Sequence, residues 1–113
     1  MNDSRMPLEI TPKDVLHLPT GSDGMLLLDC RTEQERALAH IADSMFLPMN
    51  ELGDRLAELE PHRDRPIVVY CHTGRRSLMV ARALRQAGFD HASSMAGGID
   101  RWSLEIDPSI PRY

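Results

Sequence analysis

The chain contains 113 residues, which is the size of one domain with a single hydrophobic core. Its composition, 42% hydrophobic and 27% charged, is ordinary for a globular protein and argues against disorder, and eight Pro among seven Gly without a period argue against a fibrous chain. The net charge of −4 argues against a nucleic-acid binder, and no apolar run approaches the ~20 residues that span a membrane. The N-terminus lacks the apolar region of a secretory signal, and the two cysteines form no CxxC pair. We therefore expect a reduced cytoplasmic protein without structural zinc, folded as one domain over residues 1–113 with a core at about 8–105.

Short apolar runs alternate with helix-type segments along the chain. Strands are predicted, in order, at Leu8–Ile10, Met25–Cys30, Ser44–Pro48, Ile67–Tyr70 and Ala92–Ala96. Helices are predicted from Pro12 to about Leu18, after Thr32 to about Ala39, over Glu51–Leu59, over Ser77–Ala87, and as a last turn that follows Gly97-Gly98 and holds Trp102. The predicted N-caps are Thr11, Thr32 in a capping box with Glu35, and Asn50. Gly88 suits the C-terminal end of the fourth helix.

This alternation predicts the fold class. Strands that are apolar throughout are typical of a sheet covered on both faces, so we expect an α/β domain with a small parallel sheet of four or five strands and helices on both faces. In such sheets, ligands bind beyond the carboxyl ends of the strands. Three of these ends carry polar or glycine-rich segments, at Asp29–Arg31, Cys71–Ser77 and Ala96–Gly98. We expect the functional site at this edge of the sheet.

The segment CHTGRRS, which begins at Cys71, joins the clearest strand to the clearest helix. A thiol at this position faces the N–H groups of the loop and the positive end of the following helix dipole, which favour a thiolate and an anion bound beside it. Arg75 and Arg76 add positive charge, and Gly74 permits a positive φ if the turn requires one. Ser77 either caps the helix or donates its hydroxyl to a sulfur or oxygen anion. The pattern indicates an activated nucleophilic cysteine in an anion pocket rather than a buried structural cysteine.

The second cysteine and the histidines have structural as well as functional interpretations. Cys30 could form a disulfide with Cys71, since both lie at strand ends, but a small apolar core residue is the simpler interpretation. His72 could act as a base, although an electropositive loop already favours the thiolate, so a loop or rim role is preferred. His40 could line the mouth of the pocket or be structural, and no pair of histidines has metal-ligand spacing.

Four segments, in this order, make the chain resemble the single-domain rhodanese-type sulfurtransferases. They are LLLDCRTEQE, HIADSMFLP, IVVYCHTGRRS and GFDHASSMAGGIDRW, and they cover nearly the whole chain. The CxxGxRS loop followed by GGxxxW is a specific combination. Two segments depart from the family, because Cys30 stands in a DVR-like segment and residues 39–44 replace the usual GHIPGA. Neither departure affects the loop that begins at Cys71.

The length of this loop distinguishes two chemistries that related folds host. In the phosphatases, five residues separate the cysteine from an arginine that binds the phosphate bidentately. Here four residues separate Cys71 from Arg76, and Ser77 stands where the phosphatase arginine would be. Asp29 and Asp43 are the only candidates for a general acid, and Asp29 has a better structural use. A cysteine-dependent phosphatase is therefore the less favoured interpretation, and the shorter loop resembles that of the sulfurtransferases.

The resemblance implies a two-step sulfur transfer that needs no metal and no organic cofactor. Cys71 would take the outer sulfur of a donor anion such as thiosulfate as a persulfide, and a thiophile would then accept it: cyanide in vitro, a thiol or a protein in vivo. N–H groups of the loop would hold the terminal sulfur. The expected substrate contacts are therefore the loop residues His72, Thr73, Gly74, Arg75, Arg76 and Ser77.

The resemblance also implies a supporting shell around the loop, formed by Asp29, Arg31, Glu35, His40, Gly97 and Gly98. Within it, Arg31 is free to pair with Glu35, and the two glycines allow their backbone to approach the nucleophile loop closely. Of the two loop arginines, the family motif favours Arg76 as a structural partner of Asp29 and Arg75 as the substrate contact.

Two further interpretations stay open. A sulfur-relay module would use the same persulfide but exchange its sulfur with a protein, and the ending EIDPSIPRY is similar to that of rhodanese-type domains fused to activating enzymes of sulfur-carrier pathways. A non-catalytic docking module usually lacks the loop cysteine, whereas Cys71 is present. The expected partners are a small sulfur-donor anion and a sulfur-acceptor protein, with neither nucleic acid nor membrane.

Overall fold

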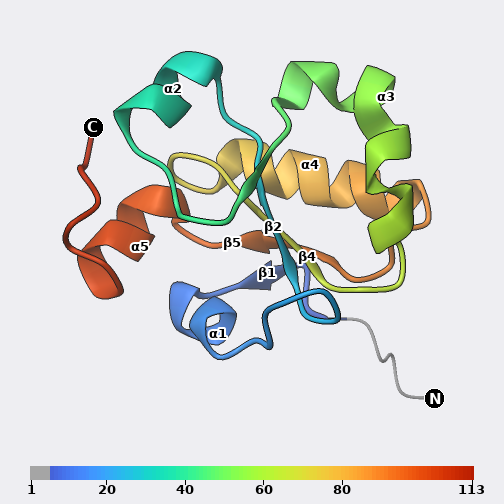
Figure 1. The fold of residues 1–113 in the computed structure, drawn as a ribbon, viewed down its shortest axis with the longest axis horizontal. Coiled ribbons are helices and arrows are strands. Elements are labelled where there is room, and N and C mark those ends of the chain that lie inside the picture. Colours follow the sequence, from blue (N-terminus) through green and yellow to red (C-terminus); the bar gives the residue numbers. More distant parts are fainter. Residues whose placement is uncertain (1–5) are drawn as a thin grey trace.

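A computed structural model describes residues 6–113, in which strands and helices alternate along the chain (Figure 1). The strands are β1 (Glu9–Ile10), β2 (Leu26–Asp29), β3 (Met45–Phe46), β4 (Ile67–Tyr70) and β5 (Ala92–Met95). The α-helices are α1 (Pro12–Leu16), α2 (Glu33–Leu38), α3 (Leu52–Arg55), α4 (Arg75–Gln86) and α5 (Gly98–Glu105). Two 3₁₀ helices, η1 (Met49–Glu51) and η2 (Leu56–His62), flank α3. No helix within the described residues is long and apolar enough to cross a membrane.

The strands form one parallel sheet in the order β1-β5-β4-β2-β3. The central strand β4 is buried along its whole length, as its apolar sequence predicts. β2 and β4 pair with Asp29 opposite Tyr70, so the segments that follow these residues leave the sheet side by side. The predicted α/β class, with a small parallel sheet and helices, is confirmed.

Each face of the sheet carries its own hydrophobic core, because successive residues of a strand point to opposite faces. On one face, Leu28 and Val69 pack with Val80 and Leu84 of α4 and with Leu59 of η2. On the other face, strand residues pack with α1 and α5, and this core includes Val15, Leu27, Val68, Met95, Ile99 and Trp102. Figure 1 shows α3 and α4 on one side of the sheet and α1 on the other. Each large aliphatic side chain buried in this way contributes about 1.5–3 kcal/mol, so both layers hold the sheet in place.

The segment between β3 and β4 differs from its prediction as a single helix over Glu51–Leu59. It is instead split into η1, the one-turn α3 and η2. The N–H of Glu51 donates to the carbonyl of Pro48 at 2.9 Å, which is the short-range bond of a 3₁₀ turn. Asn50 therefore lies inside this first turn and is exposed, so the prediction that it caps the helix is wrong.

The start of α4 also differs from its prediction. The helix begins at Arg75, two residues before Ser77, because Gly74 occupies the N-cap position with a φ of 108°. Ser77 therefore lies inside the first turn and does not cap the helix. This early start places the first turn of α4 directly beside Cys71.

The capping box of α2 is present as predicted. The N–H of Glu35 donates to Oγ1 of Thr32 at 3.2 Å, and the N–H of Thr32 donates to Oε1 of Glu35 at 3.3 Å. Reciprocal bonds of this kind fix the first turn of a helix. They hold the Glu35 carboxylate at the edge of the sheet where β2 and β4 end. α1 likewise begins after its predicted cap, Thr11, but ends at Leu16.

Candidate active site

Cys71 follows β4 directly, and its sulfur lies inside the loop that leads to α4. The N–H of Gly74 donates to Sγ at 3.1 Å, and the N–H of Ser77 donates to it at 3.3 Å. The thiol in turn donates to Oγ of Ser77 at 3.4 Å, and this hydroxyl is 2.7 Å from Oγ of Ser94 on β5. Cys71 is only 1% exposed. Two backbone donors aimed at one buried sulfur stabilise negative charge on it.

Two further N–H groups in the first turn of α4, which follows the Cys71 loop, have no acceptor in the described part of the chain. The N–H groups of Arg75 and Arg76 donate to no acceptor within residues 6–113, as expected for the first residues of a helix. α4 is 12 residues long, so the positive end of its dipole also points at this loop. The loop therefore has both the free donors and the local potential to bind a small anionic group next to Cys71.

The backbone that follows β5 supports the loop from its other side. The N–H of Ile99 donates to the carbonyl of Cys71 at 2.9 Å, and that of Asp100 donates to the carbonyl of His72 at 3.1 Å. A Cβ atom on Gly98 would lie 2.5 Å from the first carbonyl oxygen and 2.4 Å from the second, and the φ of this residue is 61°. The close approach expected of the two glycines is present at Gly98, where only glycine fits, whereas a Cβ on Gly97 would meet the side chain of Arg101.

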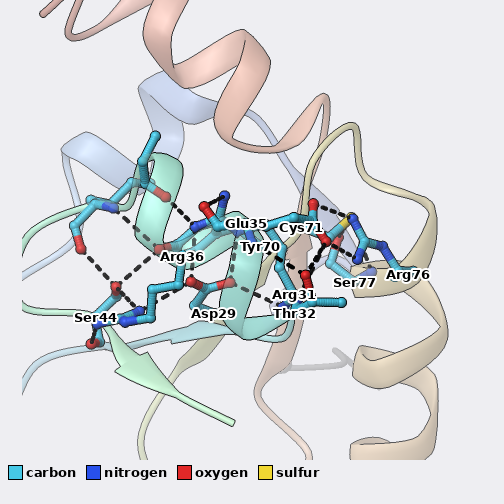
Figure 2. Close-up of polar contacts among 12 residues, drawn as sticks. Asp29, Arg31, Thr32, Glu35, Arg36, Ser44, Tyr70, Cys71, Arg76 and Ser77 are labelled. Atoms are coloured by element: carbon cyan, nitrogen blue, oxygen red, sulfur yellow. Dashed lines mark hydrogen bonds and ion pairs between the residues drawn. The ribbon is translucent and has the colours of Figure 1, made fainter. Parts of the chain in front are cut away.

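A buried ion pair lies at the end of β2, next to the Cys71 loop (Figure 2). Nε of Arg31 donates to Oδ1 of Asp29 at 2.9 Å, and its NH2 group donates to Oδ2 at 2.9 Å. Arg36 on α2 is a second partner, with its NH1 group 3.0 Å from Oδ2 of Asp29. Arg31 contacts Glu35 only through its backbone carbonyl, at 3.4 Å, and not through its carboxylate. The expected pairing of Arg31 with the Glu35 carboxylate is therefore wrong, because Asp29 takes the guanidinium.

Arg76 pairs with Glu35 and not with Asp29, which corrects the second predicted pairing. Its NH1 and NH2 groups donate to Oε1 and Oε2 of Glu35 at 2.6 and 2.9 Å, a bidentate arrangement. This contact holds the pKa of Glu35 well below its ordinary value of 4.5. Asp29 has no room for a third arginine, since Arg31 and Arg36 already occupy both of its oxygens.

The other loop arginine is in a different situation. Arg75 is exposed and has no hydrogen bond or ion pair within residues 6–113. Its charge is therefore not neutralised by a neighbouring carboxylate. The division that the family motif favours, with Arg76 as the structural cation and Arg75 as the substrate contact, is compatible with this arrangement and stays a prediction.

A cavity of about 210 Å³ opens at the same edge of the sheet, lined by Cys30, Arg31, Thr32, Pro48, Met49, Asn50 and Arg76. Burial, with a smaller contribution from Cys71, raises the pKa of the Cys30 thiol to about 12. A thiol that stays protonated is a poor nucleophile, which supports the interpretation of Cys30 as a small core residue. A larger cavity of about 490 Å³ lies at the start of β2, between Gly21 and Trp102. Of the candidate residues, only Asp43, considered as a general acid for the phosphatase alternative, lines it.

The structure adds residues that the sequence did not single out. Arg36 is the second partner of Asp29, and Tyr113 stacks on the ring of His72 with centroids 4.1 Å apart. This stacking supports a rim position for His72. His40 is exposed and has no hydrogen bond or ion pair among the described residues, so it stands apart from this network. Thr73 is exposed on the loop, and the described part of the chain contains no cluster of three or more potential metal ligands.

Together these features define an α/β domain whose central strand ends in a cysteine held by the amides of a tight, arginine-containing loop. The model of the rhodanese-like domain matches residues 11–105, and the chain therefore belongs to the rhodanese-like family.

Three relatives illustrate this membership. A sulfurtransferase of Allochromatium vinosum is 33% identical over 102 residues, which are 90% of this chain and 94% of that protein. The probable adenylyltransferase/sulfurtransferase MoeZ of Mycobacterium tuberculosis is 32% identical over 106 residues, which are 92% of this chain but 26% of MoeZ. Several curated relatives are similarly long, so the chain spans about a third of their length or less. The solved structure of a rhodanese-related protein from Thermoplasma volcanium has a TM-score of 0.73 and 29% identity, covering 91% of this chain and 94% of that one.

Proposed function

We propose that this domain is a sulfurtransferase that carries a sulfur atom as a persulfide on Cys71. The thiolate attacks the outer sulfur of an anionic donor such as thiosulfate. A bond forms between the two sulfurs, the bond from the outer sulfur to the sulfonate sulfur breaks, and sulfite leaves with the electron pair. The negatively charged persulfide then gives its outer sulfur to a thiophilic acceptor, which restores the Cys71 thiolate.

The observation that carries this proposal is the set of N–H donors around the Cys71 sulfur. Gly74 and Ser77 already donate to Sγ, and the amides of Arg75 and Arg76 have no acceptor within residues 6–113. A persulfide ends in one negatively charged sulfur, which a few fixed N–H groups can hold. The unpaired charge of Arg75 at the rim would attract the anionic donor.

The arginine arrangement disfavours the phosphatase alternative. A phosphatase needs a guanidinium that is free to bind two oxygens of the phosphate. Both terminal nitrogens of Arg76 instead donate to Glu35. Its side chain would have to leave this ion pair before it could bind a phosphate beside Cys71.

The test is intact-mass spectrometry of the reduced protein after incubation with thiosulfate. We expect a gain of one sulfur atom that cyanide removes. Cys71→Ser should show no gain, whereas Cys30→Ser, the matched control at the other buried cysteine, should load as the wild type does. Loading of Cys71→Ser, or loss of loading in Cys30→Ser, would exclude a single-nucleophile mechanism.

A sulfur-relay role is the second candidate. It is favoured by the similarity to MoeZ, which is named a probable adenylyltransferase/sulfurtransferase and of which this chain matches 26%. In that role a protein, such as a cysteine desulfurase, would load Cys71, and a second protein would accept the sulfur. Loading by a desulfurase and cysteine that is much faster than loading by thiosulfate would identify the relay. Equal or slower loading would favour the small anion as the donor.

A further inference from the structure

The side chain of Tyr113 connects three parts of the site that lie far apart in the sequence. Its hydroxyl donates to Oε2 of Glu35 on α2 at 2.6 Å and accepts from NH1 of Arg31, after β2, at 2.9 Å. Its ring stacks on His72, with the two planes inclined by 12°. Tyr113 therefore contacts the partner of Arg76, the buried arginine that follows β2 and the residue that follows Cys71.

The segment that leads to Tyr113 is itself fastened to α5. Arg112 donates from Nε to Oδ1 of Asp100 at 2.8 Å. Oγ of Ser103 donates to the carbonyl of Ile110 at 2.6 Å. These contacts hold the ring of Tyr113 at the rim of the site and reduce the entropy that its own contacts must offset.

The Glu35 carboxylate accepts hydrogen bonds from both Arg76 and the hydroxyl of Tyr113, so the two donors share its negative charge. The carboxylate of Glu35 pairs with Arg76 and so offsets the positive charge that Arg76 presents to the cavity beside Cys30. A hydrogen bond donated to a carboxylate draws part of its negative charge toward the donor. The bond from Tyr113 therefore leaves more of the Arg76 charge for an anion in the site.

Tyr113 keeps this donor role across the physiological pH range. Burial and the neighbouring Glu35 carboxylate raise the pKa of its phenol to about 12. At neutral pH the phenol is therefore protonated, and Glu35 is charged because Arg76 lowers its pKa. The hydrogen bond from phenol to carboxylate is present under the conditions in which the site would act.

We propose that Tyr113 sets the preference of the Cys71 site for anionic over neutral reactants, through its hydrogen bond to Glu35 and the ion pair of Glu35 with Arg76. Tyr113 touches no reacting atom in this role and is a positioning residue. The inference rests on the proposed function in one respect, namely that Cys71 is the reactive sulfur. It does not require that Cys71 carry a persulfide.

The test compares two alkylating reagents of nearly equal size, anionic iodoacetate and neutral iodoacetamide. In both reactions the Cys71 sulfur forms a bond to carbon and iodide leaves. The second-order rate constants are measured at one pH by mass spectrometry of the peptide that contains Cys71, which scores Cys30 separately. The ratio of the two rate constants reports the electrostatic potential at the Cys71 sulfur. A change in the general reactivity or accessibility of the sulfur affects both rate constants equally and cancels in the ratio.

Tyr113→Phe keeps the ring that stacks on His72 and removes only the hydroxyl. We expect it to lower the iodoacetate-to-iodoacetamide ratio by about two- to fivefold, the effect of a fraction of one charge at this range. Glu35→Gln removes the carboxylate charge and should raise the ratio. The two variants alter opposite ends of the same hydrogen bond. Loosened packing would not shift the ratio in opposite directions in the two variants.

Tyr70→Phe is the matched control, because it removes the other tyrosine hydroxyl, which contacts Ile41 and Ser44 rather than Glu35. It should leave the ratio unchanged even if it lowers the stability. An unchanged ratio in Tyr113→Phe, a fall in Glu35→Gln, or a Cys71 that reacts with neither reagent would overturn the inference. Alkylation needs no sulfur donor, so a protein that fails to load sulfur from thiosulfate would refute the proposed function and leave this comparison intact.

Discussion

Replacement of Asp29 by asparagine tests how much the site depends on the buried ion pair beneath it. The carboxylate accepts hydrogen bonds from the N–H and the guanidinium of Arg31 and from the guanidinium of Arg36. Asp29 and Arg31 are both 0% exposed. Asp29→Asn keeps the size of the side chain, removes its charge, and turns one acceptor into an N–H₂ group that faces donors.

The expected loss of unfolding free energy follows from the arginine that the substitution leaves buried. In the variant, Arg31 would stay buried but would lose the carboxylate to which its side chain donates two hydrogen bonds. Removal of one partner of a buried ion pair lowers the free energy of unfolding by about 3–5 kcal/mol. For a domain of this size, about 4 °C of midpoint change per kcal/mol corresponds to a Tm lower by about 12–20 °C. The displaced guanidinium would also release its bond to Tyr113, so the rim of the site should loosen with it.

Urea and thermal unfolding, followed by circular dichroism, measure this cost. Asp54→Asn is the matched control, because Asp54 is exposed and has no hydrogen bond or ion pair within residues 6–113. The control should change the free energy of unfolding by less than about 0.5 kcal/mol. A cost for Asp29→Asn as small as that of the control would refute the reasoning, since it would mean that Arg31 finds water or another partner without penalty.

Three further predictions concern the loop and its supports. Arg75→Ala should raise the KM for thiosulfate severalfold and change kcat less in a cyanide-coupled assay; an unchanged KM would remove Arg75 from the substrate site. Gly98→Ala should destabilise the fold by at least about 2 kcal/mol in urea unfolding, because Gly98 has a left-handed φ and the added Cβ would collide with two carbonyl groups. Gly53→Ala is the control and should not destabilise the fold, because a Cβ there would meet open space. Because Arg76 lowers the pKa of Glu35, the ion pair stabilises the fold above the ordinary pKa of 4.5 and is lost progressively below it. In urea titrations, Glu35→Gln should therefore be less stable than the wild type at pH 6, and the difference should shrink as the pH falls from 4.5 toward 3; a constant difference would contradict this.

The parts of the fold that the sequence predicts well are those in which one local signal dominates. β4 is an apolar run between turn residues, and α4 shows helical spacing together with a glycine after its last turn. The sequence therefore predicts the ends of both elements to within two residues. The segment over Glu51–Leu59 has a helical apolar pattern as well. There, the turn that starts at Pro48 imposes 3₁₀ geometry, and a pattern of side chains does not reveal which carbonyl a backbone N–H selects.

The sequence and its family resemblance single out most of the residues that meet at this edge of the sheet, but not most of their pairings. Asp29, Arg31 and Arg76 stand at a strand end or in the loop, whereas Glu35 is indicated by its capping box with Thr32 and by the resemblance. Which carboxylate meets which arginine depends on how α2 lies against the loop, and that is a property of the tertiary structure. Tyr113 carries no sequence signal for its role, because 78 residues separate it from Glu35.

The ion pair of Arg76 with Glu35 suits the proposed function, in which the site both accepts and releases sulfur. A persulfide held by a free arginine would be stabilised in the ground state as strongly as in the transition state, which gives no gain in rate. In this site the donors nearest the Cys71 sulfur are neutral backbone N–H groups at fixed positions, and the charge of Arg76 is offset by a carboxylate. Fixed dipoles stabilise a developing charge without reorganising, and they bind the loaded sulfur less tightly than a full charge would. On this argument, Glu35→Gln should slow transfer from the loaded Cys71 to an acceptor while it strengthens the binding of the anionic donor.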